Sequence, residues 1–473
     1  MLLNGILASS TEWNFSMANY GAVWGGLVQI GLVVISLFLG NMLRNLIPFL
    51  RKSLIPSALI GGTILLIISI ICNQLGFHLV DKQFMQVLTY HGLGIGFVAM
   101  TLKTSKATTK AGKIKVVETG LLTGGTYMLQ ALLGLGITII LFLAGSGFYA
   151  SGLILPLGYG QGPGNALAWD INYTNDYPTM FSGNGSFGLS IASIGFIVAS
   201  VVGVAFINIK RKSGKITTVG EIKEQEEIYA ESGEIPSSES IDKFSVQVGL
   251  VAIAYALSFG FMVLLGLISE FTNNLAWGFN FLWGVFAAML VKLVLKLLMK
   301  GKLVKRNYIN NYQMDRISGF CFDVMVVAGV AAIEIKDVMN YILPIILLCL
   351  VGALASYVYI RFVTKHCFKG YEHEAFVMHF ATYTGTASNG MILLREVDPN
   401  LETPVANLYV MSQVIAMVSA APLLLLLGFA GKSLTNSLIA LGVFAVLFIA
   451  YTLFLFRKLI FKKKKAEPEV VNE

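Results

Sequence analysis

Hydrophobic residues run along this chain in long, nearly uncharged stretches separated by short polar segments. Eleven stretches are apolar enough to cross a membrane as helices, because about 20 residues span the roughly 30 Å hydrocarbon core. They lie near residues 22–44, 55–75, 83–102, 118–143, 184–209, 244–268, 275–299, 316–335, 339–363, 403–428 and 433–460. The apolarity is continuous and does not alternate, which favours an all-α polytopic membrane protein over a β-barrel.

Two further apolar segments are too short and too broken by glycine to cross a membrane simply. The first runs from Leu153 to Asp170 and the second from Glu374 to Leu394. Each follows four ordinary apolar stretches in its half of the chain, and each carries small or hydroxyl side chains where a spanning helix carries leucine. A matched pair of broken segments in two halves is typical of the binding site of a secondary transporter.

The order of these segments divides the chain into two corresponding halves, each with five spanning stretches and one broken segment between the fourth and the fifth. Because five crossings are an odd number, the halves start from opposite sides of the membrane, which predicts an inverted-topology repeat with two re-entrant hairpins. The predicted parts are an N-terminal repeat at 1–210 with its hairpin at 148–169, a flexible cytoplasmic linker at 211–243, a C-terminal repeat at 244–430 with its hairpin at 374–394, and an extra helix with a basic tail at 431–473.

Basic residues gather on one side of this predicted topology. With the N-terminus outside, the loops assigned to the cytoplasm carry clusters of lysine and arginine between Arg51 and Lys465, whereas the loops assigned outside hold only Lys82, Lys336 and Lys432. This asymmetry follows the positive-inside rule and requires both broken segments to re-enter, because a full crossing would move every later cluster to the wrong side. Topology therefore accounts for the net charge of +8 without a nucleic-acid partner.

The first broken segment offers backbone and amide groups suited to an anion. Its glycines permit a tight turn and a close approach, and its proline removes one backbone donor. At such a break, free N–H groups suit a substrate carboxylate and free carbonyls suit a small cation. The residues expected to contact substrate are Gly160, Gln161, Gly162, Gly164 and Asn165.

The second broken segment offers hydroxyl and amide groups around one glycine. Its residues expected to contact substrate are Thr384, Gly385, Thr386, Ser388 and Asn389. Because hydroxyl and carbonyl oxygens are hard ligands suited to Na⁺, the candidate sodium ligands are Thr382, Thr386 and Asp323. Asp323 lies in an otherwise apolar stretch, where a carboxylate is costly unless it is paired or wetted; it could instead lie near the cytoplasmic end. The competing interpretation of both segments is that small residues only allow close helix packing.

Three other polar residues lie in or next to the apolar stretches and need an interpretation. His91 precedes a run of alternating glycines, and we interpret it as a packing residue in preference to a proton relay. His379 lies in the first arm of the second segment, next to the predicted cavity. Arg395 ends that segment, and we expect an interfacial anchor paired with Glu396 or Asp398; the alternative is that it steers an anionic substrate at the inner mouth.

The run from Gly160 to Trp169, GQGPGNALAW, resembles the glycine-rich re-entrant motif of the bacterial sodium/glutamate symporter family. Supporting patches are LIPSALIGG at 54–62, HGLGIG at 91–96 and TGTASNG at 384–390. The resemblance implies a homodimeric, inverted-repeat carrier of the bacterial inner membrane that moves glutamate with sodium by an elevator-like displacement. Ala381 and Tyr383 stand where the family often has glycine. The second segment thus has fewer glycines and more hydroxyls than the resemblance implies, so we expect this protein's own selectivity to be encoded in that segment.

The sequence therefore predicts a secondary active symporter and not an enzyme, with Na⁺ as the coupling ion, a small anionic substrate such as glutamate, and no cofactor. A carrier for citrate or another dicarboxylate, or one coupled to H⁺, is the nearest alternative. A channel also uses re-entrant loops, but its flux would not saturate with substrate. An intramembrane enzyme would need a carboxylate partner for Asp323, and the sequence shows no clear one. The sequence also contains no phosphate-binding loop, which argues against primary active transport by this chain alone.

Overall fold

The computed structural model describes residues 25–103, 110–214, 242–303, 308–398 and 402–461. Most of the predicted linker and basic tail lies outside the described residues. Within them, every regular element is a helix. This is the all-α fold that the continuous apolar stretches predict.

The helices of the first half are α2 (Gly25–Leu46), α3 (Pro48–Lys52), α4 (Ser57–Gln74), α5 (Lys82–Leu102), α6 (Lys110–Leu143), the short 3₁₀ turn η3 (Ser151–Leu153), α7 (Ile154–Gly160), α8 (Pro163–Asp176) and α9 (Ser186–Lys212). Those of the second half are α10 (Lys243–Gly266), α11 (Glu270–Gly278), α12 (Asn280–Lys300), α13 (Asn311–Ala331), α14 (Ile335–Asn340), α15 (Ile342–Cys367), α16 (Glu372–Thr384), α17 (Ala387–Val397), α18 (Val405–Ala430) and α19 (Leu434–Phe461).

Ten helices in the described part of the chain are long and apolar enough to span a membrane, namely α2, α4, α5, α6, α9, α10, α12, α15, α18 and α19. The sequence predicted eleven, and the difference is α13. This helix is 21 residues long, the length of a span, but it carries Asp315, Arg316 and Asp323. Three charged side chains make α13 too polar to count as a span by composition.

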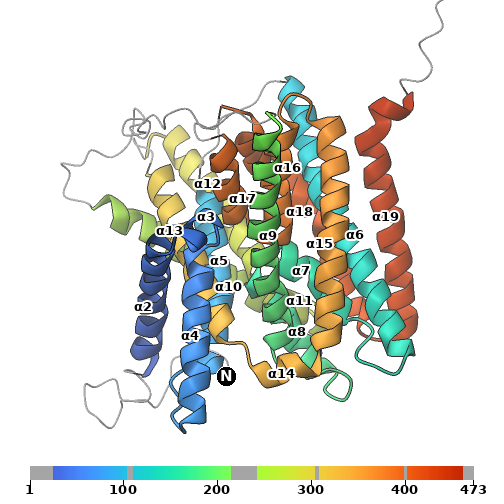
Figure 1. The fold of residues 1–473 in the computed structure, drawn as a ribbon. Coiled ribbons are helices and arrows are strands. Elements are labelled where there is room, and N and C mark those ends of the chain that lie inside the picture. The colour runs from blue at the N-terminus through green and yellow to red at the C-terminus, as the bar shows by residue number, and fades with distance from the viewer. Residues whose placement is uncertain (1–24, 104–109, 215–241, 304–307, 399–401, 462–473) are drawn as a thin grey trace, which may run out of the picture.

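The helices divide into two bundles, and each bundle contains helices from both halves of the chain. We call α2, α4, α5, α10, α12 and α13 the first bundle, which encloses two small hydrophobic cores. The second bundle contains α6 to α9 and α15 to α19 around one large core. The first bundle lies to the left in Figure 1 and most of the second to the right. The two bundles are in contact at α8 and α9, because a core of the first bundle includes Leu167 of α8 and Leu189 and Phe196 of α9.

Helix contacts in one half of the chain have counterparts in the other. Helix α2 packs on α4 as α10 packs on α12, and α4 packs on α13 as α12 packs on α5. Likewise α6 packs on α18 as α15 packs on α9, while α5 packs on α13 and α6 on α15. The helices that touch one another therefore follow the same order in both halves, α2, α4, α5, α6 and α9 in the first and α10, α12, α13, α15 and α18 in the second.

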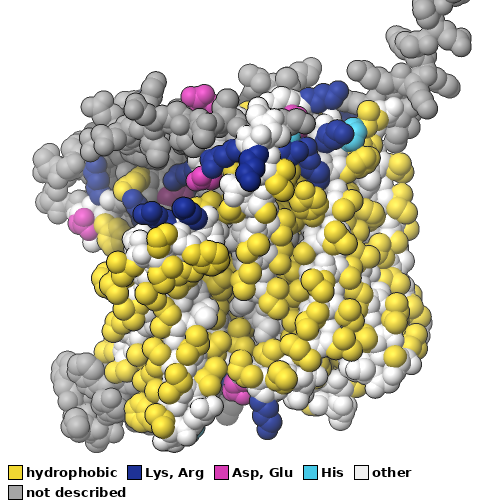
Figure 2. Space-filling view, viewed as in Figure 1, with side chains coloured by type: hydrophobic (Ala, Val, Ile, Leu, Met, Phe, Trp, Pro, Cys, Tyr) yellow, Lys and Arg dark blue, Asp and Glu magenta, His cyan; other side chains and the backbone are white. Residues whose placement is uncertain are grey.

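Charged side chains are concentrated at the ends of the molecule, with an apolar band between them (Figure 2). Lysine and arginine gather at the upper end in this view, where α9 and α15 finish. The last turn of α9 contributes Lys210, Arg211 and Lys212, and the last turn of α15 contributes Lys365. Cations there interact favourably with the negative ends of the helix dipoles.

Candidate functional site

The first broken segment forms two short helices separated by a two-residue break. Helix α7 ends at Gly160, and α8 begins at Pro163. Between them, Gly162 adopts φ 90° and ψ 177°, a conformation almost confined to glycine. Pro163 then starts α8 at the position where its missing N–H costs no hydrogen bond. The glycine-rich sequence therefore ends one helix and starts the next inside the second bundle.

The second broken segment has the same layout with different backbone angles. Helix α16 ends at Thr384 and α17 begins at Ala387. Gly385 has φ −137° and Thr386 has φ −146°, so neither residue is in the left-handed region. A Cβ atom on Gly385 would lie 2.6 Å from Nδ2 of Asn389. Here glycine is needed for space and not for a positive φ angle.

The two breaks meet in the interior of the protein. The position that a Cβ atom would take on Gly162 lies 3.5 Å from Cγ2 of Thr386 and 3.7 Å from Cε of Met325 on α13. Gly162 and Met325 are buried, and Thr386 is half-buried. Residues far apart in the sequence, from both halves of the chain and both bundles, therefore line one place.

Helix ends at this place provide positive electrostatic potential. Neither N-cap residue, Gly162 for α8 or Thr386 for α17, forms a side-chain cap. The first N–H groups of an α-helix have no partner within the helix, and the helix dipole makes that end partly positive. Two such N-termini beside each other form a site suited to an anion.

Two asparagines occupy corresponding positions in these helices. Asn165 is the third residue of α8 and Asn389 the third of α17, and their exposed fractions are only 1% and 4%. Nδ2 of Asn165 donates a hydrogen bond to Oε1 of Gln161 at 2.9 Å. Among the described residues, however, Oδ1 of Asn165 and Nδ2 of Asn389 have no hydrogen-bond partner. An unpaired buried polar atom is destabilising, and a polar ligand can supply the missing partner at either amide.

The other residues expected at the first break have structural contacts. The Gly160 carbonyl accepts a hydrogen bond of 2.7 Å from the hydroxyl of Tyr127. A Cβ atom on Gly164 would lie 2.7 Å from Cβ of Leu93 on α5. Gly164 therefore allows close packing between the bundles, as the competing interpretation proposes.

The threonines of α16 direct their hydroxyl protons to their own helix. Thr382 donates to the carbonyl of Met378, and Thr384 donates to that of Phe380, each at 2.7 Å. Both side chains are buried, whereas Thr386 and Ser388 are half-buried at the start of α17. The oxygen lone pairs of Thr382 and Thr384 are still available as acceptors.

Asp323 lies on α13, two residues before Met325. Its side chain is exposed, and it forms no hydrogen bond or ion pair with the residues that the structure describes. Since successive residues turn by about 100° around a helix, Asp323 and Met325 point to different sides of α13. The structure therefore does not place the Asp323 carboxylate against Gly162.

The two histidines differ in their surroundings. Nδ1 of His91 lies 2.7 Å from the hydroxyl of Tyr255 on α10, and its ring packs edge-on against that tyrosine. These contacts agree with a packing role. His379 is 1% exposed and stacks on Tyr383 with ring centroids 5.5 Å apart, so it supports the last turn of α16.

The predicted pairing of Arg395 with Glu396 or Asp398 is wrong. Glu396 accepts a hydrogen bond from Arg211 of α9, with Oε1 and Nη2 2.9 Å apart. The Asp398 carboxylate accepts the backbone N–H groups of Glu402 and Thr403. Both acids are thus used to fix the end of α17, and Arg395 is exposed.

Sequence reasoning missed three polar residues of α6 that support the breaks. Besides Tyr127, they are Thr123 and Gln130. Nε2 of Gln130 donates to the carbonyl of Tyr383 at 2.9 Å, and the hydroxyls of Thr123 and Tyr383 lie 2.5 Å apart. Their spacing of four and three residues puts them on one helix face. A polar stripe within an apolar span is a signal that could have identified them.

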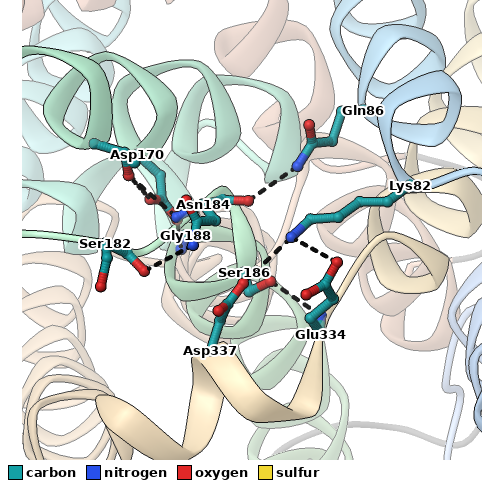
Figure 3. A network of polar contacts seen from close by, with 10 residues as sticks. Lys82, Gln86, Asp170, Ser182, Asn184, Ser186, Gly188, Glu334 and Asp337 are labelled. Atoms are coloured by element: carbon teal, nitrogen blue, oxygen red, sulfur yellow. Dashed lines mark hydrogen bonds and ion pairs between the residues drawn. The ribbon is translucent and has the colours of Figure 1, made fainter. Parts of the chain in front are cut away.

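A network of polar contacts connects α8, through Asp170, to the start of α9 (Figure 3). The Asp170 carboxylate is fully buried and accepts the N–H of Gly188, in the first turn of α9, at 2.8 Å. Nε2 of Gln86 on α5 donates to the carbonyl of Asn184 at 3.0 Å. Asp170 thus caps α9 from a neighbouring helix, and Gln86 attaches this corner to the first bundle.

An ion-paired lysine completes this network. Nζ of Lys82 on α5 lies 3.0 Å from Oε1 of Glu334 and 3.2 Å from Oδ2 of Asp337 on α14. The backbone N–H of Glu334 donates to the hydroxyl of Ser186 at 3.0 Å. Lys82 therefore joins α5 to the connection between α13 and α15, close to the start of α9.

Comparison with known proteins identifies a family. A family model described as sodium/glutamate symporter matches residues 25–391. A comparison with individual curated proteins found no match. The family match begins at α2 and ends within α17, so it includes both helix breaks.

Proposed function

Because the chain belongs to the sodium/glutamate symporter family, we propose that it couples inward movement of Na⁺ to uptake of glutamate through a site between the two helix breaks. One observation carries this proposal for the site. The uncapped N-termini of α8 and α17 lie side by side at Gly162 and Thr386, and each includes a buried asparagine amide with an atom that has no partner among the described residues.

The chemistry of the two helix ends suits an amino dicarboxylate. Each carboxylate binds the free N–H groups of one N-terminus, and Nδ2 of Asn389 adds a donor. Oδ1 of Asn165 is an acceptor, which suits the ammonium group of the substrate. A glutamate molecule thus has partners for both of its carboxylates and for its amine.

We propose that Na⁺ binds near the second break, where oxygen atoms of two threonines are available. Thr386 is half-buried beside Gly162, and the hydroxyl oxygen of Thr382 keeps free lone pairs after donating to Met378. In transporters with broken helices, unwound backbone carbonyls and the C-terminal ends of half-helices coordinate Na⁺, and α16 ends in this way at Thr384. Asp323, exposed on α13 without a partner among the described residues, points away from Gly162 and is not included in this proposed sodium site.

Each broken segment is proposed to be a re-entrant hairpin, and the two halves an inverted repeat. Helices α7, α8, α16 and α17 contain 7, 14, 13 and 11 residues, all shorter than a span of about 20. Helices α16 and α17 lie above α7 and α8 in Figure 1, and the corresponding helix contacts of the two halves support the repeat. With α13 as a further crossing, each half has five spans.

The upper, basic end of the molecule is proposed to face the cytoplasm of a bacterium, with the protein in the inner membrane. The concentration of lysine and arginine at that end supports this orientation. The N-terminus then lies outside, and the linker and C-terminus lie inside. The first hairpin enters from outside and the second from the cytoplasm.

Transport is proposed to occur by an elevator-like movement of the second bundle past the first. Both breaks belong to the second bundle, which supports a site that moves as a unit. Close packing of Gly164 on Leu93 leaves no side chain of α8 to interlock with α5 there. A homodimer in the lipid bilayer is proposed from the family resemblance alone.

Binding linkage tests this function directly. We expect calorimetry on the purified protein to show that Na⁺ raises glutamate affinity, and that glutamate raises Na⁺ affinity by the same factor. Binding of citrate or another dicarboxylate in place of glutamate tests the alternative substrates. Glutamate affinity measured at different pH values without Na⁺ tests the alternative of coupling to H⁺. Equal glutamate affinity in Na⁺ and in K⁺ would exclude sodium coupling.

A further inference from the structure

One tyrosine side chain contacts both helix breaks. Tyr127 of α6 is 7% exposed, and its hydroxyl donates to the Gly160 carbonyl, the last residue of α7. Its ring packs edge-on against Tyr383 in the last turn of α16, with centroids 5.9 Å apart and planes at 79°. Gly160 is required here because a Cβ atom at this position would overlap Cε1 of Tyr127.

Tyr383 is itself held by the same face of α6. Its hydroxyl lies 2.5 Å from that of Thr123, and its carbonyl accepts a hydrogen bond of 2.9 Å from Gln130. Thr123, Tyr127 and Gln130 therefore form one row that positions the final turn of α16, and Tyr127 alone in this row also binds the end of α7. The ends of α7 and α16 are therefore both held by one helix, α6.

We propose that Tyr127 is a positioning residue that sets the distance between the two helix breaks, and thereby the length of the dicarboxylate that the site accepts. The inference rests on the proposed function for the substrate, but the contacts do not depend on it. Gly160 lies two residues before the N-cap of α8, and Tyr383 lies three residues before the N-cap of α17. A shift of either arm therefore moves one anion-binding N-terminus relative to the other.

The position of α6 makes this role compatible with transport. Helix α6 belongs to the second bundle, together with both broken segments. Tyr127 consequently moves with the site and keeps the same spacing in outward-facing and inward-facing states. The residue acts through the two helix ends, and its effect is on recognition of the substrate and not on the rate of the movement.

Two variants of Tyr127 separate the role of its hydroxyl from that of its ring, and a third variant is the control. Tyr127→Phe removes the hydrogen bond to Gly160 and keeps the ring against Tyr383, whereas Tyr127→Leu removes both contacts. The matched control is Tyr149→Phe. Tyr149 is also buried in the second bundle, and its hydroxyl donates to a glycine carbonyl, that of Gly431, at 2.9 Å.

Hydrogen exchange tests the positioning role without reference to any substrate. We expect Tyr127→Phe to raise amide exchange at residues 157–162, and Tyr127→Leu to raise it at 157–162 and at 383–389. Tyr149→Phe should leave both segments unchanged. Unaltered exchange at both segments in folded Tyr127→Leu protein would overturn the inference.

Uptake kinetics test the consequence for selectivity. For Tyr127→Phe we expect KM for glutamate to rise about tenfold, as for loss of one hydrogen bond, with Vmax within about twofold. The ratio of KM for aspartate to KM for glutamate should fall, and Tyr149→Phe should keep the wild-type ratio. A fall in Vmax with an unchanged KM ratio would contradict a role in length selection. Failure of the wild-type protein to transport either amino acid would instead refute the proposed function, and hydrogen exchange would still decide the role of Tyr127.

Discussion

At the first helix break the chain turns through Gly162 with φ 90°, and at the second it turns through Gly385 and Thr386 with both φ angles negative. The first break needs glycine for its positive φ angle, and its polar side chains are amides. The second break needs glycine because a Cβ atom there would be too close to its neighbours, and its nearby polar side chains include hydroxyls. Yet both place an asparagine at the third position of the helix that follows. The shared asparagine fits the proposed anion site, and the hydroxyls found only at the second break are the reason for proposing the cation there.

Gly162→Ala is expected to have the largest effect on this comparison. An alanine at φ 90° and ψ 177° is strained by about 1–3 kcal/mol, and relief of that strain would turn the N-terminus of α8 away from Thr386. We expect uptake to fall roughly a hundredfold, near the upper end of that strain, measured as Vmax/KM in liposomes with equal amounts of folded protein.

Gly145→Ala is the matched control, because Gly145 also has a positive φ, 85°, but has open space around it. If both glycine variants lose uptake equally, backbone strain in general and not the geometry of the break is responsible.

Replacing the two asparagines tests the feature that the breaks share. Asn165→Leu and Asn389→Leu keep the side-chain volume and remove the polar atoms, so each should raise KM by about 10- to 100-fold, as for hydrogen bonds to charged groups of about 1.5–3 kcal/mol. Concentration dependence of uptake measures this effect.

Asn172→Leu is the control for this pair, because Asn172 also lies on α8 and its Nδ2 also lacks a partner among the described residues, but it is far from the break. If Asn172→Leu changed KM as much as Asn165→Leu, the change could not be attributed to contact between substrate and the two asparagines of the breaks.

Gly385→Ala should have a smaller effect than Gly162→Ala. The backbone at Gly385 does not need a positive φ, but the new Cβ atom would meet Nδ2 of Asn389 at 2.6 Å. We expect KM for glutamate to rise by up to about tenfold through displacement of that amide. An effect as severe as that of Gly162→Ala would show that the two breaks have the same backbone requirement.

Arg211→Gln should have the smallest effect. The Arg211–Glu396 ion pair is partly exposed at the end of α17, and such pairs contribute about 0.2–1 kcal/mol. Uptake should fall by no more than about fivefold. The comparison variant is Arg395→Gln, which should transport normally; a rise in KM that high salt abolishes would instead support steering of the substrate by Arg395.

The sequence predicted where the helices break, because glycines and hydroxyl residues interrupt apolar stretches at 160–164 and 384–389. It did not predict the partners of those breaks. Tyr127 binds Gly160 across 33 positions, and Gln130 binds Tyr383 across 253, and such contacts depend on how the helices pack. The wrong partner for Glu396 has the same cause, since Arg211 is 185 positions away and Arg395 is adjacent. Charge also made α13 ambiguous as a span, although its length is sufficient.

Uptake by the purified protein in liposomes tests the central claim most directly. Labelled L-glutamate is supplied outside under an inward Na⁺ gradient, an inward H⁺ gradient, or neither. We predict uptake that saturates with glutamate, is driven by the Na⁺ gradient, and is lost in Gly162→Ala protein that remains folded. Uptake that no gradient stimulates, or that the Gly162→Ala variant retains, would contradict a sodium-coupled site between the two helix breaks.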